Sequence, residues 1–208
     1  YTGITPLLGD AHLKQQDLPP DIRRYLEFRP DEAKKLLAEA GYPNGFATTI
    51  IFTVRYGSTH KGVAAALVDY LSRIGIKANL EIREYVRFQE TVLAAKYEGM
   101  AMVWASSGQD TDTPIWDTHH TSSEARNRSH VVDPQMDKLL EAQRTETNET
   151  KRRELLYEIQ RYWAQQQYYL SWPLAPIAGF YPPYVKNVNF KGLTKNKVDF
   201  MSFIWLDK

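Results

Sequence analysis

Small polar and acidic side chains follow an apolar run near the middle of the chain, in the stretch MVWASSGQDTDTPIW. The run ends at Trp104, and Ser106, Ser107, Asp110 and Asp112 come after it. The indole of Trp104 could form a wall against a bound molecule or could pack into the core at the end of a strand. The two acids could pair with a cationic group such as an amine, or could be solvated loop residues. Because they lie two residues apart in a loop, their spacing does not define a general acid and base pair.

The sequence lacks the common catalytic and metal-binding motifs. It contains no G-x-S-x-G, no H-E-x-x-H and no glycine-rich phosphate loop. His119 and His120 are adjacent, so their side chains diverge on a helix or a strand and are poorly placed to share a metal ion. With no cysteine, the chain has no disulfide, zinc–thiolate site or cysteine nucleophile. We therefore expect no catalysis, no metal and no cofactor; a small hydrolase using Asp110 and Asp112 with His119 or His120 is the least favoured alternative.

Charge and hydropathy exclude two further classes of protein. The formal net charge is +1, so no overall field attracts the chain to nucleic acid. No run of about 20 apolar residues occurs, so no segment is expected to span a bilayer as a helix. No signal peptide opens the sequence, which starts at Tyr1 without a methionine, and we expect a processed or trimmed product.

Helix and strand patterns alternate before the polar stretch. Residues 30–41 predict a helix, because Pro30 suits a first turn, Gly41 suits a C-terminal end and apolar residues recur at helical spacing. A helix capped by Ser58 or Thr59 is expected after the first strand. Strand, helix, strand, helix, strand is the order of a parallel βαβαβ unit with right-handed crossovers. The expected strands are 47–56, 76–84 and 99–105, and the second connecting helix is 87–97.

Ligands of open parallel sheets bind beyond the carboxyl ends of the strands. Three strand ends are therefore candidate binding positions, and Tyr56 and Tyr85 follow the first two of them. We expect these tyrosines to line a shared crevice with the polar stretch after Trp104. The first strand end also runs into a helix N-terminus, whose N–H groups could hold a carboxylate or phosphate or could simply be capped.

The segments that flank this unit differ from it. The first 28 residues are rich in proline and predict an irregular, extended lead-in along the surface. Two helices are expected after the polar stretch, starting at Asp133 and at Asn148. From Tyr168 onward the chain is rich in proline and aromatic residues, with short β-like runs at 168–172 and 199–206.

The order of these motifs resembles that of the family 5 extracellular solute-binding proteins, which serve bacterial ABC importers of dipeptides, oligopeptides, nickel chelates and related solutes. The resemblance implies an α/β fold of the periplasmic-binding-protein type (type II, cluster C), in which a mostly parallel sheet is flanked by helices. It also implies a protein of two lobes that closes on its ligand. The similar pieces include RPDEAKKLLAEAGYPNGF, the strand IGIKANLE and the D-P-x-x-D-x-L-L motif that begins at Asp133, within a match from about Tyr25 to Pro173.

Members of this family are much longer than this chain, so the resemblance implies that the chain holds the C-terminal lobe. Residues 25–172 would form that lobe, 1–24 the incoming crossover, and 173–208 a tail that returns to the missing N-terminal lobe. The implied function is the substrate-binding component of an ABC-type importer, with a peptide or similar small solute as ligand and an ABC permease as partner. The implied location is periplasmic or extracellular, at the membrane through a lipoprotein anchor. An extracytoplasmic sensor or interaction module built on the same lobe is the alternative.

The resemblance also bears on the polar stretch. Peptide-binding relatives carry G-W-x-A-D-Y-x-D-P after the third strand, and its first acid holds the amino terminus of the peptide. Aligned from Trp104, that acid falls on Ser107 and the later acid on Asp110. The amine-binding acid of that motif is therefore missing here, unless Asp110 or Asp112 takes its role through a shifted loop, and sugars, modified peptides and other solutes remain open as ligands. The predicted ligand-binding residues are Trp104, Ser106, Ser107, Asp110, Asp112, Tyr56 and Tyr85.

Overall fold

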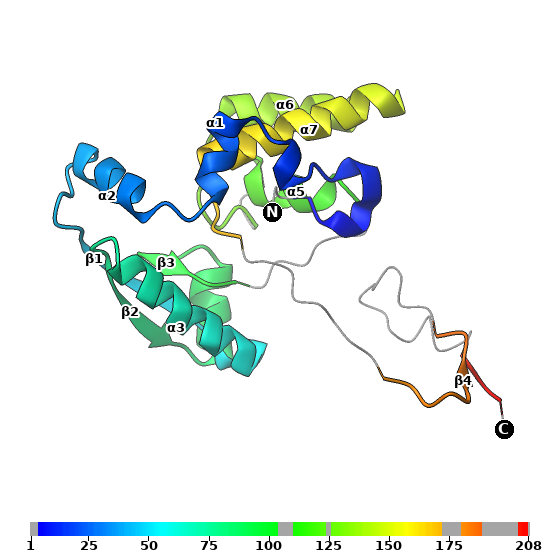
Figure 1. Cartoon of the computed structure of the whole chain (residues 1–208), viewed down its shortest axis with the longest axis horizontal. Coiled ribbons are helices and arrows are strands. Elements are labelled where there is room, and N and C mark those ends of the chain that lie inside the picture. Colours follow the sequence, from blue (N-terminus) through cyan, green and yellow to red (C-terminus); the bar gives the residue numbers. More distant parts are fainter. Residues whose placement is uncertain (1–3, 104–109, 124–125, 172–179, 189–203, 208) are drawn as a thin grey trace.

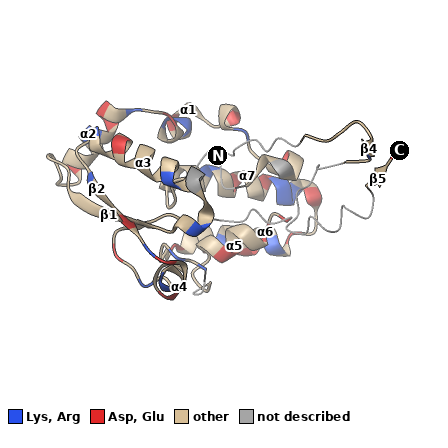
Figure 2. Cartoon of the chain, turned by 90° about the horizontal axis from the view of Figure 1, so that it is seen from below, with Lys and Arg blue, Asp and Glu red and all other residues tan. Residues whose placement is uncertain are grey.

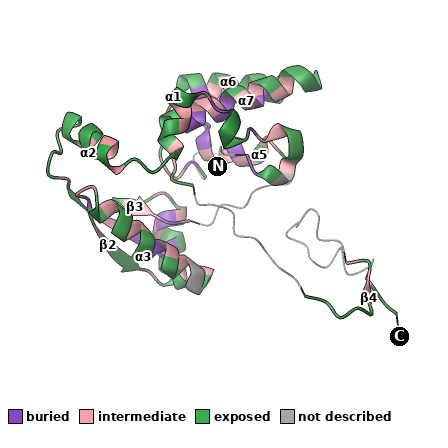
Figure 3. Ribbon diagram, viewed as in Figure 1, coloured by how far each residue is buried: buried purple, intermediate pink, exposed green. Residues whose placement is uncertain are grey.

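The computed structural model describes residues 4–103, 110–123, 126–171, 180–188 and 204–207. Figure 1 shows a sheet with its covering helices, a separate group of helices, and a short ribbon near the C-terminus. Buried residues lie between the sheet and its helices and, separately, among the grouped helices (Figure 3). The described chain therefore has more than one apolar core.

The sheet consists of parallel strands with β1 in its centre. The order is β2-β1-β3, and both neighbours run parallel to β1. Ile50 of β1 pairs with Leu80 on one side and with Met100 on the other. The predicted parallel βαβαβ arrangement is therefore confirmed. The strands are β1 (Ala47–Phe52), β2 (Lys77–Ile82) and β3 (Met100–Ala101).

Helices cover both faces of the sheet, because β1 carries apolar residues at successive positions. Helix α3 (Ser58–Ser72) packs over Ile50 and Phe52, and Ile51 packs on the other face under α4 (Tyr85–Phe88) and the π-helical turn η5 (Gln89–Leu93). Two details of the prediction are wrong. The N-cap of α3 is Gly57, whose φ of 92° suits glycine, and neither Ser58 nor Thr59 takes that position. The second helix begins at Tyr85 and its last turn ends at Leu93, both earlier than predicted.

Strand β2 is more exposed than its alternating sequence suggests. Leu80 is 39% exposed and Ile82 is 54% exposed, although both lie on the predicted apolar face. Strand β2 is at the edge of the sheet, and Ala78 is its one described residue that packs against the core under α3. The alternation thus sets which side chains share a face, whereas the place of the strand in the sheet sets their burial.

Helix α2 (Pro30–Glu39) matches the predicted helix and begins with Pro30. The turn after it brings two glycines together. A Cβ atom on Gly45, where φ is 71°, would lie 1.9 Å from the carbonyl oxygen of Gly75. Only glycine allows this approach, which joins the turn before β1 to the turn before β2.

Three helices form the second group. The sequence predicted α6 and α7 but not α5, whose 7 residues are too few for a clear periodicity. The carboxylate of Asp133 accepts hydrogen bonds from the first backbone N–H groups of α6, and Asn148 caps α7 in the same way. The helices are α5 (Thr113–His119), α6 (Pro134–Thr145) and α7 (Glu149–Gln166), and their shared core contains Ile4, Ile115, Met136, Leu140, Leu156, Ile159 and Trp163.

The N-terminal segment is not the extended lead-in that its prolines suggested. It forms short helical turns that lie against α7, with Leu13 and Leu18 buried. The fully buried side chain of Gln160 accepts a hydrogen bond from the N–H of Leu13 and donates one to the carbonyl of Ala11, each at 2.9 Å. A polar residue inside α7 thus satisfies the backbone of a segment that has no sheet partner of its own. The turns are η1 (Pro6–Ala11), η2 (Gln15–Asp17), α1 (Pro20–Arg23) and η3 (Arg24–Leu26).

The described part of the C-terminal segment contains a two-stranded antiparallel ribbon, β4 (Val185–Lys186) with β5 (Trp205–Leu206). Strand β5 falls within the predicted run 199–206. The other predicted run, at 168–172, is wrong for its described residues, which form no strand; Tyr168 and Tyr169 instead pack against the core of the helical group. None of the helices in the described ranges is both long and apolar enough to cross a membrane.

Candidate functional site

The two predicted tyrosines lie at the carboxyl edge of the sheet. Tyr56 ends the 3-10 turn η4 (Val54–Tyr56), which follows β1, and Tyr85 begins α4 directly after β2. Both are half-buried. The ring of Tyr56 packs edge-on against Phe88, with 5.9 Å between the ring centroids, so the hydrophobic contact holds it in place. The sequence therefore placed both side chains correctly at neighbouring strand ends.

The structure adds Arg55, which the sequence reading did not select. Its guanidinium lies over the ring of Tyr85, 5.3 Å from the centroid. Arg55 is exposed, and no carboxylate within the described residues forms an ion pair with it. A signal was present in the sequence, since no acid occurs between Ala47 and Val68. A cation without an acidic partner at this edge can attract an anionic group of a ligand.

Exposed apolar side chains also occur at this edge of the sheet. Val54, Ile82 and Val86 are each more than half exposed, at the same edge of the sheet. The N-terminus of α3 follows Gly57 and has no side-chain cap. This edge therefore combines a positive charge, aromatic rings and apolar surface, which suits an organic anion better than an inorganic one.

The predicted acids lie elsewhere, at the start of α5. The Oδ1 atom of Asp110 accepts hydrogen bonds from the N–H groups of Asp112 at 2.9 Å and Thr113 at 2.7 Å. The carboxylate of Asp112 is bound by Arg144 and Gln143 of α6. Burial by itself would raise the pKa of Asp112, but these partners lower it below its ordinary value. Trp104, Ser106 and Ser107 lie outside the described residues.

The predicted residues thus form two groups in the described structure. Tyr56 and Tyr85 stand with Arg55 at the ends of β1 and β2, whereas Asp110 and Asp112 belong to the helical group through α5 and α6. Acidic and basic residues are mixed along the helices of the described chain (Figure 2). At the Arg55 edge the acid next to Tyr85 is Glu84, which caps α4 through the N–H of Val86, and no ion pair joins it to Arg55 in the described residues.

His119 and His120 have different partners in the structure. The Nε2 atom of His119 accepts a hydrogen bond from the indole N–H of Trp163, and its Nδ1 lies 3.1 Å from the carbonyl oxygen of Ile115. His120 instead stacks on Trp116, with 3.7 Å between the ring centroids. Within the part of the chain that the structure describes, no group of three or more metal-binding side chains could hold an ion.

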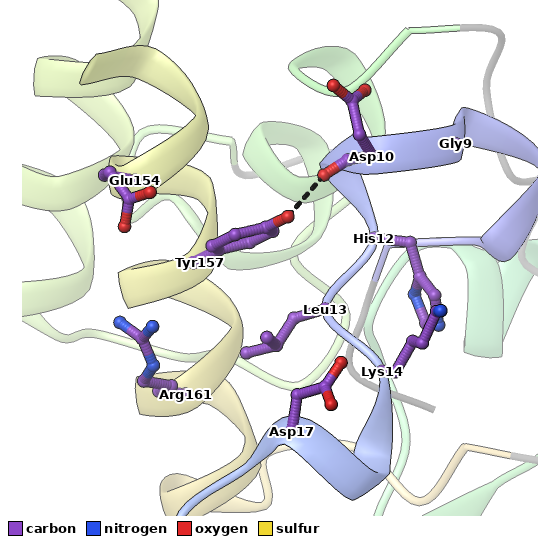
Figure 4. A pocket seen from close by; sticks show the side chains of 9 residues that line it. All are labelled: Gly9, Asp10, His12, Leu13, Lys14, Asp17, Glu154, Tyr157 and Arg161. Carbon is purple, nitrogen blue, oxygen red and sulfur yellow. Dashed lines mark hydrogen bonds between the residues drawn. The ribbon is translucent and has the colours of Figure 1, made fainter. Parts of the chain in front are cut away.

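A separate hollow of about 640 Å³ lies between the N-terminal turns and α7 (Figure 4). Tyr157 crosses it and donates a hydrogen bond to the carbonyl of Asp10 at 2.7 Å. Side chains of both charges line it, and none of the predicted ligand-binding residues does. The lining residues are Gly9, Asp10, His12, Leu13, Lys14, Asp17, Glu154, Tyr157 and Arg161.

Comparison with protein families gives a match over residues 4–125 to the family described as bacterial extracellular solute-binding proteins, family 5 Middle. The heme-binding protein A of Haemophilus influenzae is 27% identical over 186 residues, which cover 84% of this chain and 33% of that protein. A dipeptide-binding protein of Pseudomonas aeruginosa is 27% identical over 193 residues, which cover 87% of this chain and 35% of that protein. The chain therefore spans about a third of the length of these relatives.

Solved structures show the same fold. The periplasmic binding protein DppA from Helicobacter pylori, in complex with the peptide STSA, aligns with a TM-score of 0.69 and 24% identity, over 88% of this chain and 35% of that one. The oligopeptide-binding protein AppA from Bacillus subtilis, in complex with a nonapeptide, aligns with a TM-score of 0.71 and 20% identity, over 98% of this chain and 41% of that one. The type II periplasmic-binding-protein fold expected from the sequence is confirmed.

Proposed function

Because this chain belongs to the family 5 bacterial extracellular solute-binding proteins, we propose that it is part of the substrate-binding component of an ABC-type importer. Its task is to bind a solute outside the cytoplasm and deliver it to an ABC permease. It binds the solute without chemical change. The relatives whose names include peptides make a peptide or similar small solute the favoured ligand class.

The observation that carries this proposal is the guanidinium of Arg55 at the carboxyl edge of the sheet, stacked on Tyr85 and without an acidic partner in the described residues. A carboxylate of the solute pairs with Arg55, and the apolar surface around it receives a neighbouring side chain. Tyr56 and Tyr85 form walls of the site. The remaining predicted residues have roles in the same proposal: Trp104 stacks on the solute, Ser106 and Ser107 donate hydrogen bonds, and Asp110 or Asp112 meets a cationic group.

The lobe assignment belongs to the same proposal. Residues 25–172 form the C-terminal lobe, while 1–24 and 173–208 cross to an N-terminal lobe, so that the solute is enclosed between the lobes. Exposed aromatic residues of the C-terminal segment support this, since Phe180 is 94% exposed and Trp205, in strand β5, is 54% exposed. The location is periplasmic or extracellular, with a lipoprotein anchor in the full-length protein.

The test uses the full-length gene product and two probes, the peptide Ala-Ala-Ala and its C-terminal amide. The free carboxylate should bind tighter, and Arg55→Met should weaken its binding by about 10- to 100-fold while changing the amide little. Arg73→Met is the matched control, because Arg73 pairs with Asp69 on the surface of α3. Equal effects of both variants would disprove the role of Arg55. Absence of thermal stabilisation across a panel of peptides, sugars and chelates would argue against solute capture itself.

A second candidate function, a sensor or interaction module, is favoured by the same exposed ribbon. In that case the ribbon would contact a membrane partner directly. Limited proteolysis of the full-length protein distinguishes the two functions. If the protein is a solute-binding component, the rest of the protein should protect the ribbon from cleavage. If it is a sensor, the ribbon should be protected only when membranes that contain the partner are added.

A further inference from the structure

His120, at the end of α5, is a buried histidine with an unsatisfied ring nitrogen. The residue is 7% exposed, and its Nε2 atom forms no hydrogen bond in the part of the chain that the structure describes. The other ring nitrogen, Nδ1, lies 3.1 Å from the backbone nitrogen of Ser122 and 2.8 Å from its hydroxyl oxygen. Because buried polar atoms in proteins nearly always have a partner, the orphan Nε2 points to a partner that the neutral ring does not engage.

Two carboxylates of α6 face this nitrogen. Oε1 of Glu141 lies 3.5 Å from Nε2 of His120, and Oδ1 of Asp137 lies 4.0 Å from it. The two acids are four residues apart, so they share one face of the helix. Asp137 is also fixed in place, since its Oδ1 accepts a hydrogen bond from the N–H of Thr121 at 2.9 Å. Two negative charges at these distances favour the charged form of an imidazole ring.

The other charged groups around the ring are already paired. The ring stacks on Trp116, with 3.7 Å between the ring centroids and an interplanar angle of 11°. The guanidinium of Arg144 lies 3.5 Å from the centroid of the Trp116 ring and forms an ion pair with Asp112 at 2.6 Å. Asp117 of α5 is paired with Arg126 at 2.7 Å. These pairs therefore leave the two acids of α6 to the buried ring.

We propose that His120, Glu141 and Asp137 form a proton-binding site that fastens α5 to α6. Histidine is the side chain that takes up a proton between about pH 5 and 8. Once the ring of His120 is protonated, Nε2–H faces Glu141 and Nδ1–H donates to the hydroxyl of Ser122. The proton thus converts an unpaired nitrogen into an ion pair between the two helices. The attraction is modest, because the side chain of Glu141 is 61% exposed.

The first test follows the ring of His120 by NMR, in the full-length gene product with ¹³C-labelled histidine. The signal of this ring is identified by its loss in His120→Asn. The pH at which the ring is half protonated should fall by about 0.2 to 0.7 of a pH unit in Glu141→Gln, because one attracting charge is removed. Asp137→Asn should cause a smaller fall, since its oxygen is farther from the ring. Glu154→Gln, the same change on α7 at an acid that forms no ion pair in the described residues, should leave the titration unchanged.

The second test measures the fastening of α5 by hydrogen exchange of its backbone amides, corrected for the intrinsic rate. Relative to the wild type, Glu141→Gln should reduce the protection of α5 by about twofold or more at about pH 5.5, and should change it little at about pH 8.5. The comparison at one pH cancels the effect of His119, which is the same in both proteins. In a His120→Asn background, the effect of Glu141→Gln should no longer depend on pH.

Two results would overturn the inference. If the ring of His120 is half protonated at the same pH in the wild type and in Glu141→Gln, this acid does not hold the proton. If Glu141→Gln reduces the protection of α5 equally at both pH values, the acid supports α6 without the proton. Neither measurement involves a solute, so the failure of this inference is distinct from the failure of the proposed function.

Discussion

His119 should make the stability of the helical group depend on pH. The residue is 5% exposed, and burial lowers its pKa from the ordinary 6.5 to about 4. The neutral ring also suits its partners, because Nε2 accepts from the indole N–H of Trp163 and Nδ1–H donates to the carbonyl of Ile115. Protonation would place a second N–H against the indole donor.

The direction and size of this pH dependence follow from the pKa values of His119 in the unfolded and the folded chain. As pH falls below 6.5, the unfolded chain binds a proton on this histidine, while the folded chain does so only near pH 4. The neutral ring therefore makes its full contribution to the free energy of unfolding above about pH 6.5. This contribution decreases as the pH falls from about 6.5 to about 4, and changes little at lower pH. The total loss is about 3 kcal/mol, since each pKa unit corresponds to roughly 1.4 kcal/mol.

Urea unfolding at about pH 7 and at about pH 4.5 measures this loss in the wild type and in His119→Gln. The glutamine side chain of this variant does not ionise in this range, so the variant should lose about 2.5 kcal/mol less between the two pH values. Trp163→Phe should keep most of the pH dependence, because burial is the main cause of the pKa shift. Equal pH dependence in wild type and His119→Gln would refute this reasoning.

Two stability predictions follow from single contacts. Asp133→Ala removes the hydrogen-bond acceptor for the N-terminal N–H groups of α6 and for two tyrosine hydroxyls. This variant should lower the free energy of unfolding by about 2–4 kcal/mol. A loss under about 0.5 kcal/mol, measured by urea unfolding, would contradict this prediction. Gly45→Ala should cost more than about 3 kcal/mol because of the contact with Gly75, whereas Gly41→Ala, with open space at its Cβ position, should cost about 1 kcal/mol. Similar losses for the two glycine variants would show that the close approach is unimportant.

Much of the fold could be predicted because its signals are local. The apolar run at Ile50 and Ile51 identified the central strand, and the Asp133 and Asn148 caps marked the starts of α6 and α7. The lead-in was predicted wrongly, because its prolines suggested an extended chain. Its helical turns are held by Gln160, which is distant in sequence and which no local pattern connects to them.

The candidate site shows the same division. The strand-end rule located Tyr56 and Tyr85, and the run from Ala47 to Val68, which contains no acid, distinguishes Arg55 in the sequence. The spacing of Asp110 and Asp112 could not separate their roles. Only the packing of α6 against α5 brings Arg144 to one of these acids and leaves the other exposed.

The order of residues alone was enough to specify the parallel α/β unit, the family and the places of Tyr56 and Tyr85 at neighbouring strand ends, because periodicity, caps and turns act over a few residues. Tertiary structure decided which charged side chains have a partner within the protein. A charged side chain binds a ligand less readily once folding has brought it a partner of opposite charge. The partner of Asp112 is Arg144, which is more than 30 residues away in the sequence. For Arg55, no acidic partner is present in the described residues.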